Sequence, residues 1–211
     1  MRTLVAIALS AGILVCSSWT GKAIVICDPD EFADGTLLNT IWPGITLTAL
    51  DDPAGTVLPD GNVYAVNSTC VSTGMRGFGN SEPGLCPAWG NGNFDYLRVD
   101  FSMGATEVYL DFVANDAGGD ANPYINAYDA GGNLVDSDTV SYVAAQAFAT
   151  LSVSHPDIAY IEASWDMLAR SQNGSLDNLR YEPASVPDAS SALMLLTVAL
   201  LGLGALSRSK N

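Results

Sequence analysis

Apolar and polar side chains alternate in short runs from residue 24 to residue 184, and this two-residue period most constrains the fold of the chain. In the segment EVYLDF, Val108, Leu110 and Phe112 share one face while Tyr109 and Asp111 take the other, as on a half-buried antiparallel strand. Turn-forming stretches such as DAGGN, SHPD and SQNGS separate the runs. The pattern predicts an all-β domain, a jelly-roll-like antiparallel β-sandwich of about eight to nine strands. The expected strands cover residues 45–50, 62–66, 96–102, 106–115, 124–130, 133–141, 146–154, 158–165 and 176–182.

The first 23 residues have the three parts of a secretory signal peptide. Arg2 is the positive start, Leu4 to Val15 is a short apolar stretch, and small residues lie at the −3 and −1 positions of a cleavage site after Ala23. The alternative is an uncleaved membrane helix, for which the apolar stretch is short. The sequence therefore predicts export, with a signal peptide at 1–23, a β-sandwich at 24–184 and a separate C-terminal segment at 185–211.

The C-terminal segment has the length of a membrane span. The 19 residues between Asp188 and Arg208 are uncharged, and as a helix they would extend roughly 29 Å, close to the thickness of a bilayer core. Arg208 and Lys210 follow at once, and basic residues tend to stay on the cytoplasmic side. We therefore expect a transmembrane helix with a basic stop and the body of the protein outside. Plain single-span anchoring is one interpretation of this segment.

The body is strongly acidic. All 23 acidic residues lie between Asp28 and Asp188, where only four basic residues occur, so this part has a formal charge of −19. Nucleic acid and anionic lipid surfaces are poor partners for such a charge, whereas divalent cations and neutral polysaccharide are better ones.

Three cysteines remain after the signal peptide, namely Cys27, Cys70 and Cys86. Cys70 and Cys86 enclose a stretch rich in glycine, serine and proline that has little pattern to fold by itself, so a disulfide between them is the economical prediction for an exported protein. Cys27 is then odd, and its pairing with one of the other two stays an alternative. A zinc site is not expected, because His155 is the one histidine and no Cys-x-x-Cys spacing occurs.

No catalytic residue emerges from the sequence. His155 stands in an expected turn, and neither a serine nucleophile elbow nor a glycine-rich phosphate loop is present. Many acids are available for a glycosidase, but no spacing singles out a pair. We therefore expect a non-catalytic body.

The acids at the two ends of the body suggest a calcium site. On an alternating strand Asp177 would face the same way as Leu179 and Tyr181, towards the core, where a lone carboxylate is costly. First and last strands of jelly rolls commonly lie side by side, which would bring Asp177 near Asp30 and Glu31, and carboxylate oxygens are the ligands that calcium prefers. The predicted ligands are Asp30, Glu31 and Asp177. A second candidate is the loop from residue 116 to 120, and hydrogen-bonded or solvated carboxylates are the alternative for both.

The segment VPDASSALMLLTVALLGLGALSRSK resembles the C-terminal sorting signal of exosortase-processed bacterial surface proteins, the PEP-CTERM group and its VPDSG-CTERM variant. Val186, Pro187 and Asp188 match the first three positions of the variant motif, and an apolar helix and a basic end follow in the same order. Ala189 and Ser190 depart from the Ser-Gly of the variant, which leaves the processing subclass open. The segments DEFADGTLLNTIWPGITLTA and GSLDNLRYE also resemble the ends of sandwich domains attached to such tails.

This resemblance implies export, membrane insertion by the tail and cleavage near the Val-Pro motif by an exosortase, a membrane-embedded cysteine transpeptidase of which this chain would be the substrate. It also implies delivery to the cell surface or to an exopolysaccharide matrix. Pro187 suits the role, because it cannot join a helix interior and keeps the motif extended above the bilayer.

Two functions remain for the body. The first is a structural protein of the extracellular matrix, and the alternative is a carbohydrate-binding, lectin-like module. Tyr124 and Tyr128 share one strand face, and Tyr109, Tyr160 and Trp165 could join them in an aromatic binding surface. Tyrosines on sandwich strands also serve as cross-strand packing, and the matrix role is the favoured interpretation.

Overall fold

The computed structural model describes residues 23–50, 61–80, 89, 95–114, 122–141, 147–165 and 174–184. Residues 1–22 of the predicted signal peptide, the sorting motif Val186-Pro187-Asp188, the basic stop, Cys86 and the loop from 116 to 120 lie outside the described residues. Within the described residues, none of the helices has the length and apolar character needed to cross a membrane.

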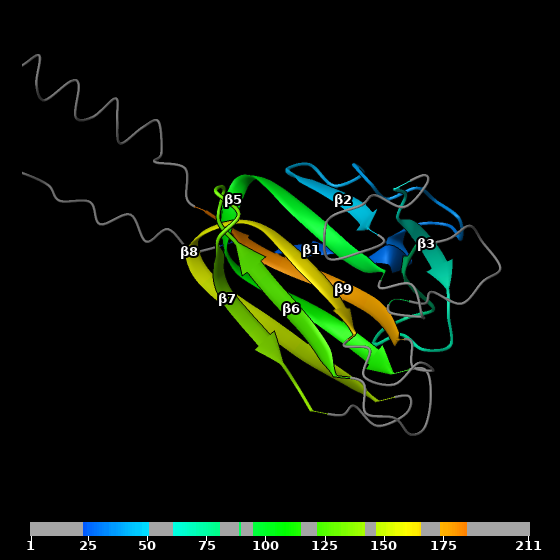
Figure 1. The fold of residues 1–211 in the computed structure, drawn as a ribbon. Helices are drawn as coiled ribbons and strands as arrows, with labels where there is room; N and C mark the ends of the chain where they lie inside the picture. Colours follow the sequence, from blue (N-terminus) through cyan, green and yellow to red (C-terminus); the bar gives the residue numbers. More distant parts are fainter. Residues whose placement is uncertain are drawn as a thin grey trace, which may run out of the picture.

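The described chain is all-β, as the alternation predicts. One antiparallel sheet of nine strands carries the fold, with a single 3-10 turn η1 (Pro29–Glu31) beside it in the described part (Figure 1). The strands are β1 (Val25–Cys27), β2 (Ile45–Leu50), β3 (Tyr64–Asn67), β4 (Arg76–Gly79), β5 (Tyr96–Ala114), β6 (Pro123–Tyr128), β7 (Leu134–Thr139), β8 (Phe148–Trp165) and β9 (Gly174–Pro183). They follow the order β3-β4-β9-β5-β8-β6-β7, with β1 also paired to β9 and β2 also paired to β5.

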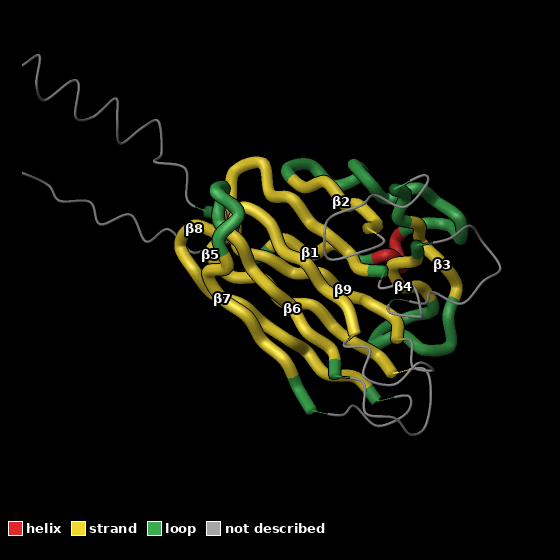
Figure 2. The backbone as a smooth tube through the Cα atoms, in the orientation of Figure 1, coloured by secondary structure: helices red, strands yellow, loops and turns green. Residues whose placement is uncertain are grey.

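The sheet folds over on itself because β5 and β8 both turn back halfway. Phe101 and Val108 are seven residues apart on β5, about 23 Å in a straight strand. Nevertheless the ring of Phe101 lies 5.0 Å from that of Tyr181, the residue that pairs with Val108. Gly104, with φ of 72°, lies between the two halves of β5, where a register shift interrupts the pairing with β8. Figure 2 shows the long strands curving from one layer into the other.

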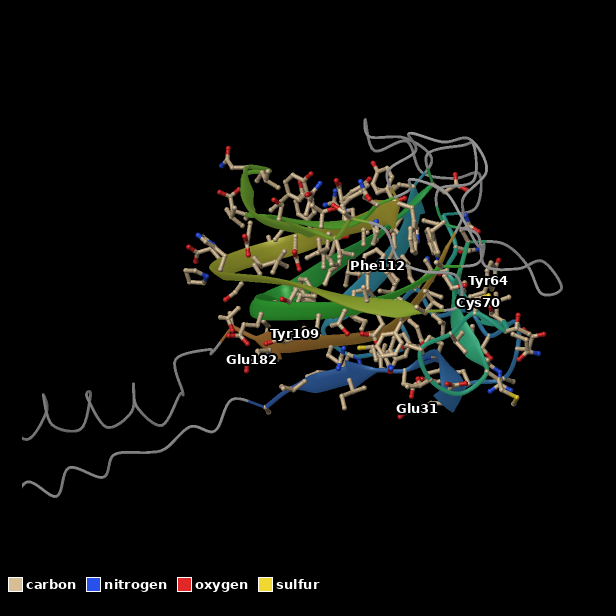
Figure 3. All side chains as sticks on the ribbon, turned by 90° about the horizontal axis from the view of Figure 1, so that it is seen from below. Glu31, Tyr64, Cys70, Tyr109, Phe112 and Glu182 are labelled. Carbon is tan, nitrogen blue, oxygen red and sulfur yellow. The ribbon has the colours of Figure 1, made fainter. Side chains whose placement is uncertain are left out.

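Two layers result. Layer A contains β2, the first half of β5, the second half of β8, β6 and β7, while layer B contains the first half of β8, the second half of β5, β9, β1, β4 and β3. The apolar faces of both layers enclose one continuous core. Phe112 of layer B meets Trp165 of layer A there, with ring centroids 6.0 Å apart, and Figure 3 shows Phe112 inside the sandwich.

The sequence predicts separate strands at 96–102 and 106–115 and at 146–154 and 158–165. The structure joins each pair into one bent strand, β5 and β8, and the expected turn at SHPD is the bend of β8. A second difference is β4, which lies in the stretch between Cys70 and Cys86 that has little sequence pattern. There Gly77 approaches the backbone of β9 so closely that an added Cβ would lie 2.9 Å from the carbonyl oxygen of Leu176.

The first and last strands lie side by side, as expected. β1 pairs with β9 in the register Val25 with Tyr181 and Cys27 with Leu179. Cys27 has a free thiol in the core, where burial, together with the charge of Glu31, raises its pKa to about 12. A thiol so protonated and enclosed is a poor nucleophile.

A β-bulge at Asn178 reverses the strand phase within β9. Asn178 has φ of 48°, and the register with β5 shifts, since Asp177 pairs with Asp111 but Arg180 pairs with Tyr109. An advance of three residues along β9 thus matches an advance of two residues along β5. This is the geometry of a bulge with one residue in the left-handed region.

The prediction that Asp177 shares the core-facing side of Leu179 and Tyr181 is therefore wrong. Leu176 pairs with Phe112, and both belong to the core, so the next residue, Asp177, faces outwards beside Asp111. After the bulge, Leu179 and Tyr181 return to the core. Strand alternation predicts the facing of a residue only where the ladder is uninterrupted.

One edge of layer B, the first half of β8, is covered by acids from layer A. The backbone N–H of Ser152 on β8 donates to Asp138 of β7 at 2.9 Å, and the N–H of Ser154 donates to Asp136 at 2.7 Å. These groups would otherwise be unpaired ladder donors.

Candidate functional site

The outer face of layer A carries tyrosines and hydrogen-bonding side chains. On β6 the residues Ile125 and Ala127 are buried in the core, so Tyr124, Asn126 and Tyr128 point outwards. The pairing of β6 with β7 and β8, and of β8 with β5, places their outward residues in neighbouring rows. We call this surface the tyrosine face; it consists of Tyr124, Asn126, Tyr128, Ser137, Thr139, Tyr160, Glu162, Arg98 and Asp100.

Three planar groups stack across the tyrosine face. The rings of Tyr128 and Tyr160 are 4.8 Å apart with an interplanar angle of 12°. On the other side of the pair, the guanidinium carbon of Arg98 lies 3.8 Å from the centroid of the Tyr160 ring. Arg98 also donates to Asp100 from Nε and Nη2, at 3.1 and 2.8 Å, and lies 3.8 Å from Glu162. The stack is thus held in place by charge-assisted hydrogen bonds.

The surroundings of the stack also shift the pKa values of its side chains. Burial, followed by the charge of Glu162, raises the pKa of both phenols, Tyr128 and Tyr160. Burial raises the pKa of Glu162 above its ordinary value, while a hydrogen bond from Tyr128 and the charge of Arg98 oppose this effect. The two tyrosines are therefore neutral at physiological pH and contribute hydroxyl groups to the tyrosine face.

A groove of about 320 Å³ opens between β6 and β7 at one side of the tyrosine face. In the register, Tyr124 lies opposite Thr139 and Asn126 lies opposite Ser137, so the ring, the amide and the two hydroxyls converge on one surface. Thr139 donates its hydroxyl to the carbonyl of Pro123 at 2.9 Å. We call this the β6–β7 groove; its lining residues are Asn122, Tyr124, Asn126, Ser137, Asp138 and Thr139.

Of the five aromatic residues that the sequence offers for a binding surface, the structure brings three together, Tyr124, Tyr128 and Tyr160. Trp165 is 3% exposed and belongs to the core. Tyr109 lies on the outer face of layer B, where its hydroxyl donates to Glu107 at 2.8 Å and its ring lies 5.9 Å from the guanidinium carbon of Arg180. Figure 3 shows Tyr109 on the side of the sandwich that carries β9 and β1.

Arg98 and Glu162 are parts of this surface that were not predicted from the sequence. Their places depend on the pairing of β5 with β8, where Arg98 lies opposite Glu162 and Asp100 opposite Tyr160. The outward positions of both residues follow from strand alternation, but the register between two strands so distant in sequence does not.

The predicted calcium ligand Asp177 holds a loop. It is fully buried because the segment from Ser68 to Arg76 covers it. Its Oδ2 accepts from the backbone N–H of Ser72 at 2.9 Å and of Thr73 at 3.0 Å, and lies 2.8 Å from the hydroxyl of Ser72. Its Oδ1 accepts from the N–H of Asn178 at 2.8 Å.

The predicted ligand Asp30 holds the other end of the same loop. Its Oδ1 accepts from the backbone N–H of Met75 at 2.8 Å and of Arg76 at 3.0 Å. Gly74, with φ of 56°, lets the chain approach, because an added Cβ would overlap the Asp30 carboxylate. The third predicted ligand, Glu31, lies in η1 and is exposed.

In the described parts of the chain, no three acidic, histidine or cysteine side chains gather closely enough to hold a metal ion. The carboxyl next to Asp177 is instead that of Asp111, which was not predicted as a ligand from the sequence. Asp111 accepts from Arg180 at 2.8 Å and from Thr150 at 2.6 Å, and it lies 2.8 Å from the Ser72 hydroxyl. Calcium binding at Asp30, Glu31 and Asp177 stays a prediction.

Cys70 follows β3, is half-buried and has a free thiol in the structure. Since Cys86 lies outside the described residues, the Cys70–Cys86 disulfide also stays a prediction.

The fold and the tyrosine face define an antiparallel β-sandwich with one polar, aromatic sheet face. No protein-family model matches the chain, and no curated protein matches it either. Among solved structures, the chain is similar to the K2 cleaved adhesin domain of Lys-gingipain, with a TM-score of 0.39 and 14% identity over 75% of this chain and 99% of that one. It is also similar to a fucose binding module of Streptococcus pneumoniae, with a TM-score of 0.30 and 16% identity over 73% of this chain and 99% of that one. A third similar structure is an arabinose-bound α-L-arabinofuranosidase, with a TM-score of 0.38 and 10% identity over 75% of this chain and 26% of that one.

Proposed function

We propose that this chain is an exported protein of the cell surface or exopolysaccharide matrix, and that its non-catalytic, jelly-roll-like sandwich binds carbohydrate through the tyrosine face. Export and sorting rest on the N-terminal segment and on the tail, in which Val186-Pro187-Asp188 would be recognised by an exosortase. The tail would hold the chain in the membrane until it is processed.

The observation that carries the binding function is the tyrosine face itself. Sugars offer apolar C–H faces that pack on aromatic rings and hydroxyl groups that both donate and accept hydrogen bonds, and binding sites combine such apolar surfaces with a few placed polar groups. The half-exposed tyrosines of β6 and the polar residues of β7 provide both on one sheet face. The acidic body adds no attraction for nucleic acid.

Replacing Tyr124 with alanine is expected to weaken binding of a soluble polysaccharide about tenfold, or ~1.4 kcal/mol, because an aromatic wall of the groove is lost. Affinity electrophoresis or calorimetry with the purified body measures this, after a glycan array has identified a bound sugar. Tyr109→Ala is the matched control, since Tyr109 is a half-exposed strand tyrosine near an arginine but on the other layer. Equal losses in both variants would contradict a site on the tyrosine face, and a silent array would favour a purely structural matrix role.

The proposed sorting predicts a defined mature mass. Protein extracted from the cell surface should begin near Ile24 and lack the residues after the Val-Pro-Asp motif, because both ends would be removed during export. Intact-mass spectrometry of the native material checks this. A dominant species that still contains Arg208 would contradict the proposed processing and indicate that the tail is a plain membrane anchor.

A further inference from the structure

We infer that the β6–β7 groove accepts a sugar residue without negative charge and discriminates against uronic acids and sulfated sugars. This inference rests on the proposed function and names the class of ligand for one part of the tyrosine face.

The first observation is the hydrogen-bonding character of the groove. Its lining combines side-chain amides of Asn122 and Asn126 with the hydroxyls of Ser137 and Thr139, next to the ring of Tyr124. Amides and hydroxyls each provide donors and acceptors, as sugar hydroxyls do, so the two sets are complementary without any formal charge. The volume of about 320 Å³ is at the small end of ligand pockets and suits one or two sugar rings.

The second observation is the sign of the charge around the groove. Asp138 is among its lining residues, but in the register it lies opposite the buried Ile125, so its carboxylate points to the other face of β7 from Ser137 and Thr139. There it accepts from the backbone N–H of Ser152 on β8 at 2.9 Å, so it brings no cation-binding or anion-binding group into the groove. Glu162 of β8 lies opposite Asn126 in the register. No lysine, arginine or histidine is among the lining residues that the structure describes.

Arg98, the basic residue of the tyrosine face, is bound by other groups of that face. Arg98 is on β5, two strands away from β6, and is bound by Asp100 and by the Tyr160 ring. A carboxylate or sulfate in the groove would therefore lose part of its hydration with no cation in the lining to replace it, on the same sheet face as the Glu162 carboxyl, which costs energy. A hydroxymethyl group at the same position of the sugar has no such cost.

Matched pairs of oligosaccharides test this inference. Each pair contains a neutral oligomer of glucose, galactose or mannose and the corresponding uronate oligomer of equal length, and calorimetry measures the affinity for the intact body at low salt. We expect at least one neutral member to bind and its uronate counterpart to bind at least tenfold more weakly. Equal or tighter binding of the uronate would overturn the inferred ligand class and leave the proposed function standing. Absence of binding for every sugar would overturn the proposed function itself.

Ser137→Lys places a cation at the groove and is expected to reduce the preference for the neutral sugar at least threefold. Ser137 is exposed on an edge strand, where lysine is well tolerated. Thr46→Lys is the control, because Thr46 is an exposed residue of β2 at the opposite edge of layer A. Four strand spacings separate β2 from β7, about 19 Å, which exceeds the screening length of ~8–10 Å at physiological salt.

An unchanged preference in Ser137→Lys, with wild type still selecting the neutral sugar, would overturn the assignment to the groove. The assignment to the groove would also be overturned if Thr46→Lys shifts the preference as strongly as Ser137→Lys does, because net charge alone would then explain the selection. Raising the salt should reduce the effect of Ser137→Lys, since a partly exposed charge is screened.

Discussion

Replacing Asp177 with alanine is expected to lower the free energy of unfolding by about 3–5 kcal/mol. The carboxyl accepts hydrogen bonds from three backbone N–H groups, those of Ser72, Thr73 and Asn178, and it is fully buried. Alanine would leave these donors without a partner beneath the loop, and each unsatisfied buried group costs about 1–3 kcal/mol. Urea unfolding of the purified body measures the change.

The control is Asp34→Ala. Asp34 is exposed and accepts one backbone hydrogen bond, from Asn67 at 2.8 Å, so its loss should cost about 1 kcal/mol or less. A loss for Asp177→Ala no larger than for Asp34→Ala would contradict the holding role of Asp177. Repeating the measurement with calcium and with a chelator addresses the predicted metal site: a loss that is equal in both conditions reports hydrogen bonding, whereas a loss confined to calcium reports metal binding.

The second large effect is a dependence of stability on pH. The Ser72 hydroxyl has one hydrogen, yet its oxygen lies 2.8 Å from Oδ2 of Asp111 and 2.8 Å from Oδ2 of Asp177. One of these two contacts then needs a hydrogen from a carboxyl group, so the geometry favours one shared proton on the pair. Arg180 forms an ion pair with Asp111, so we place the shared proton on the carboxyl group of Asp177.

The pKa of Asp177 is raised above its ordinary value of 3.8, chiefly by burial, although its hydrogen bonds oppose the shift. The folded state therefore holds this proton more tightly than the unfolded state does. Its contribution to stability is complete below pH 3.8 and is lost as the pH rises through the raised pKa. Other charges packed near the loop, Asp30 and Arg76, lie at its far end.

We therefore expect the stability difference between wild type and Asp177→Asn to narrow as the pH is raised from about 4 to 8, because asparagine has no proton to lose. Urea unfolding of both proteins across this range measures the difference, and Asp34→Asn controls for the removal of one negative charge from an acidic protein. A difference that widens with pH would show that Asp177 is ionised when folded and would contradict the shared proton.

Much of the sheet could be predicted from alternation alone. β2 occupies the residues of the run ITLTAL, and β6 keeps Tyr124 and Tyr128 on one face because its ladder with β8 is regular. Tyr160 could be assigned to that surface only through the register of β8 against β6, a long-range property that no local pattern contains.

The errors have local physical causes. The predicted facing of Asp177 is wrong because a bulge at Asn178 follows it directly. Asparagine is one of the few residues that tolerate the left-handed region which this bulge requires. Strand β4 escaped prediction because its sequence, RGFG, has two glycines and one large apolar side chain, and close packing against β9 rather than β-propensity selects them. Pairs such as Asp111 with Asp177 arise from these tertiary details.

The acids that cover the edge of β8 affect how the protein self-associates at high local concentration. Extended edges recruit strands from neighbouring molecules, and the proposed display at a surface would bring many copies of the chain together. By occupying the donors of Ser152 and Ser154, the carboxylates of Asp138 and Asp136 remove the first hydrogen bonds that an incoming strand would form. Their negative charge also repels the same edge of an approaching copy. This edge of β8 is in this way protected against pairing with a strand of another copy.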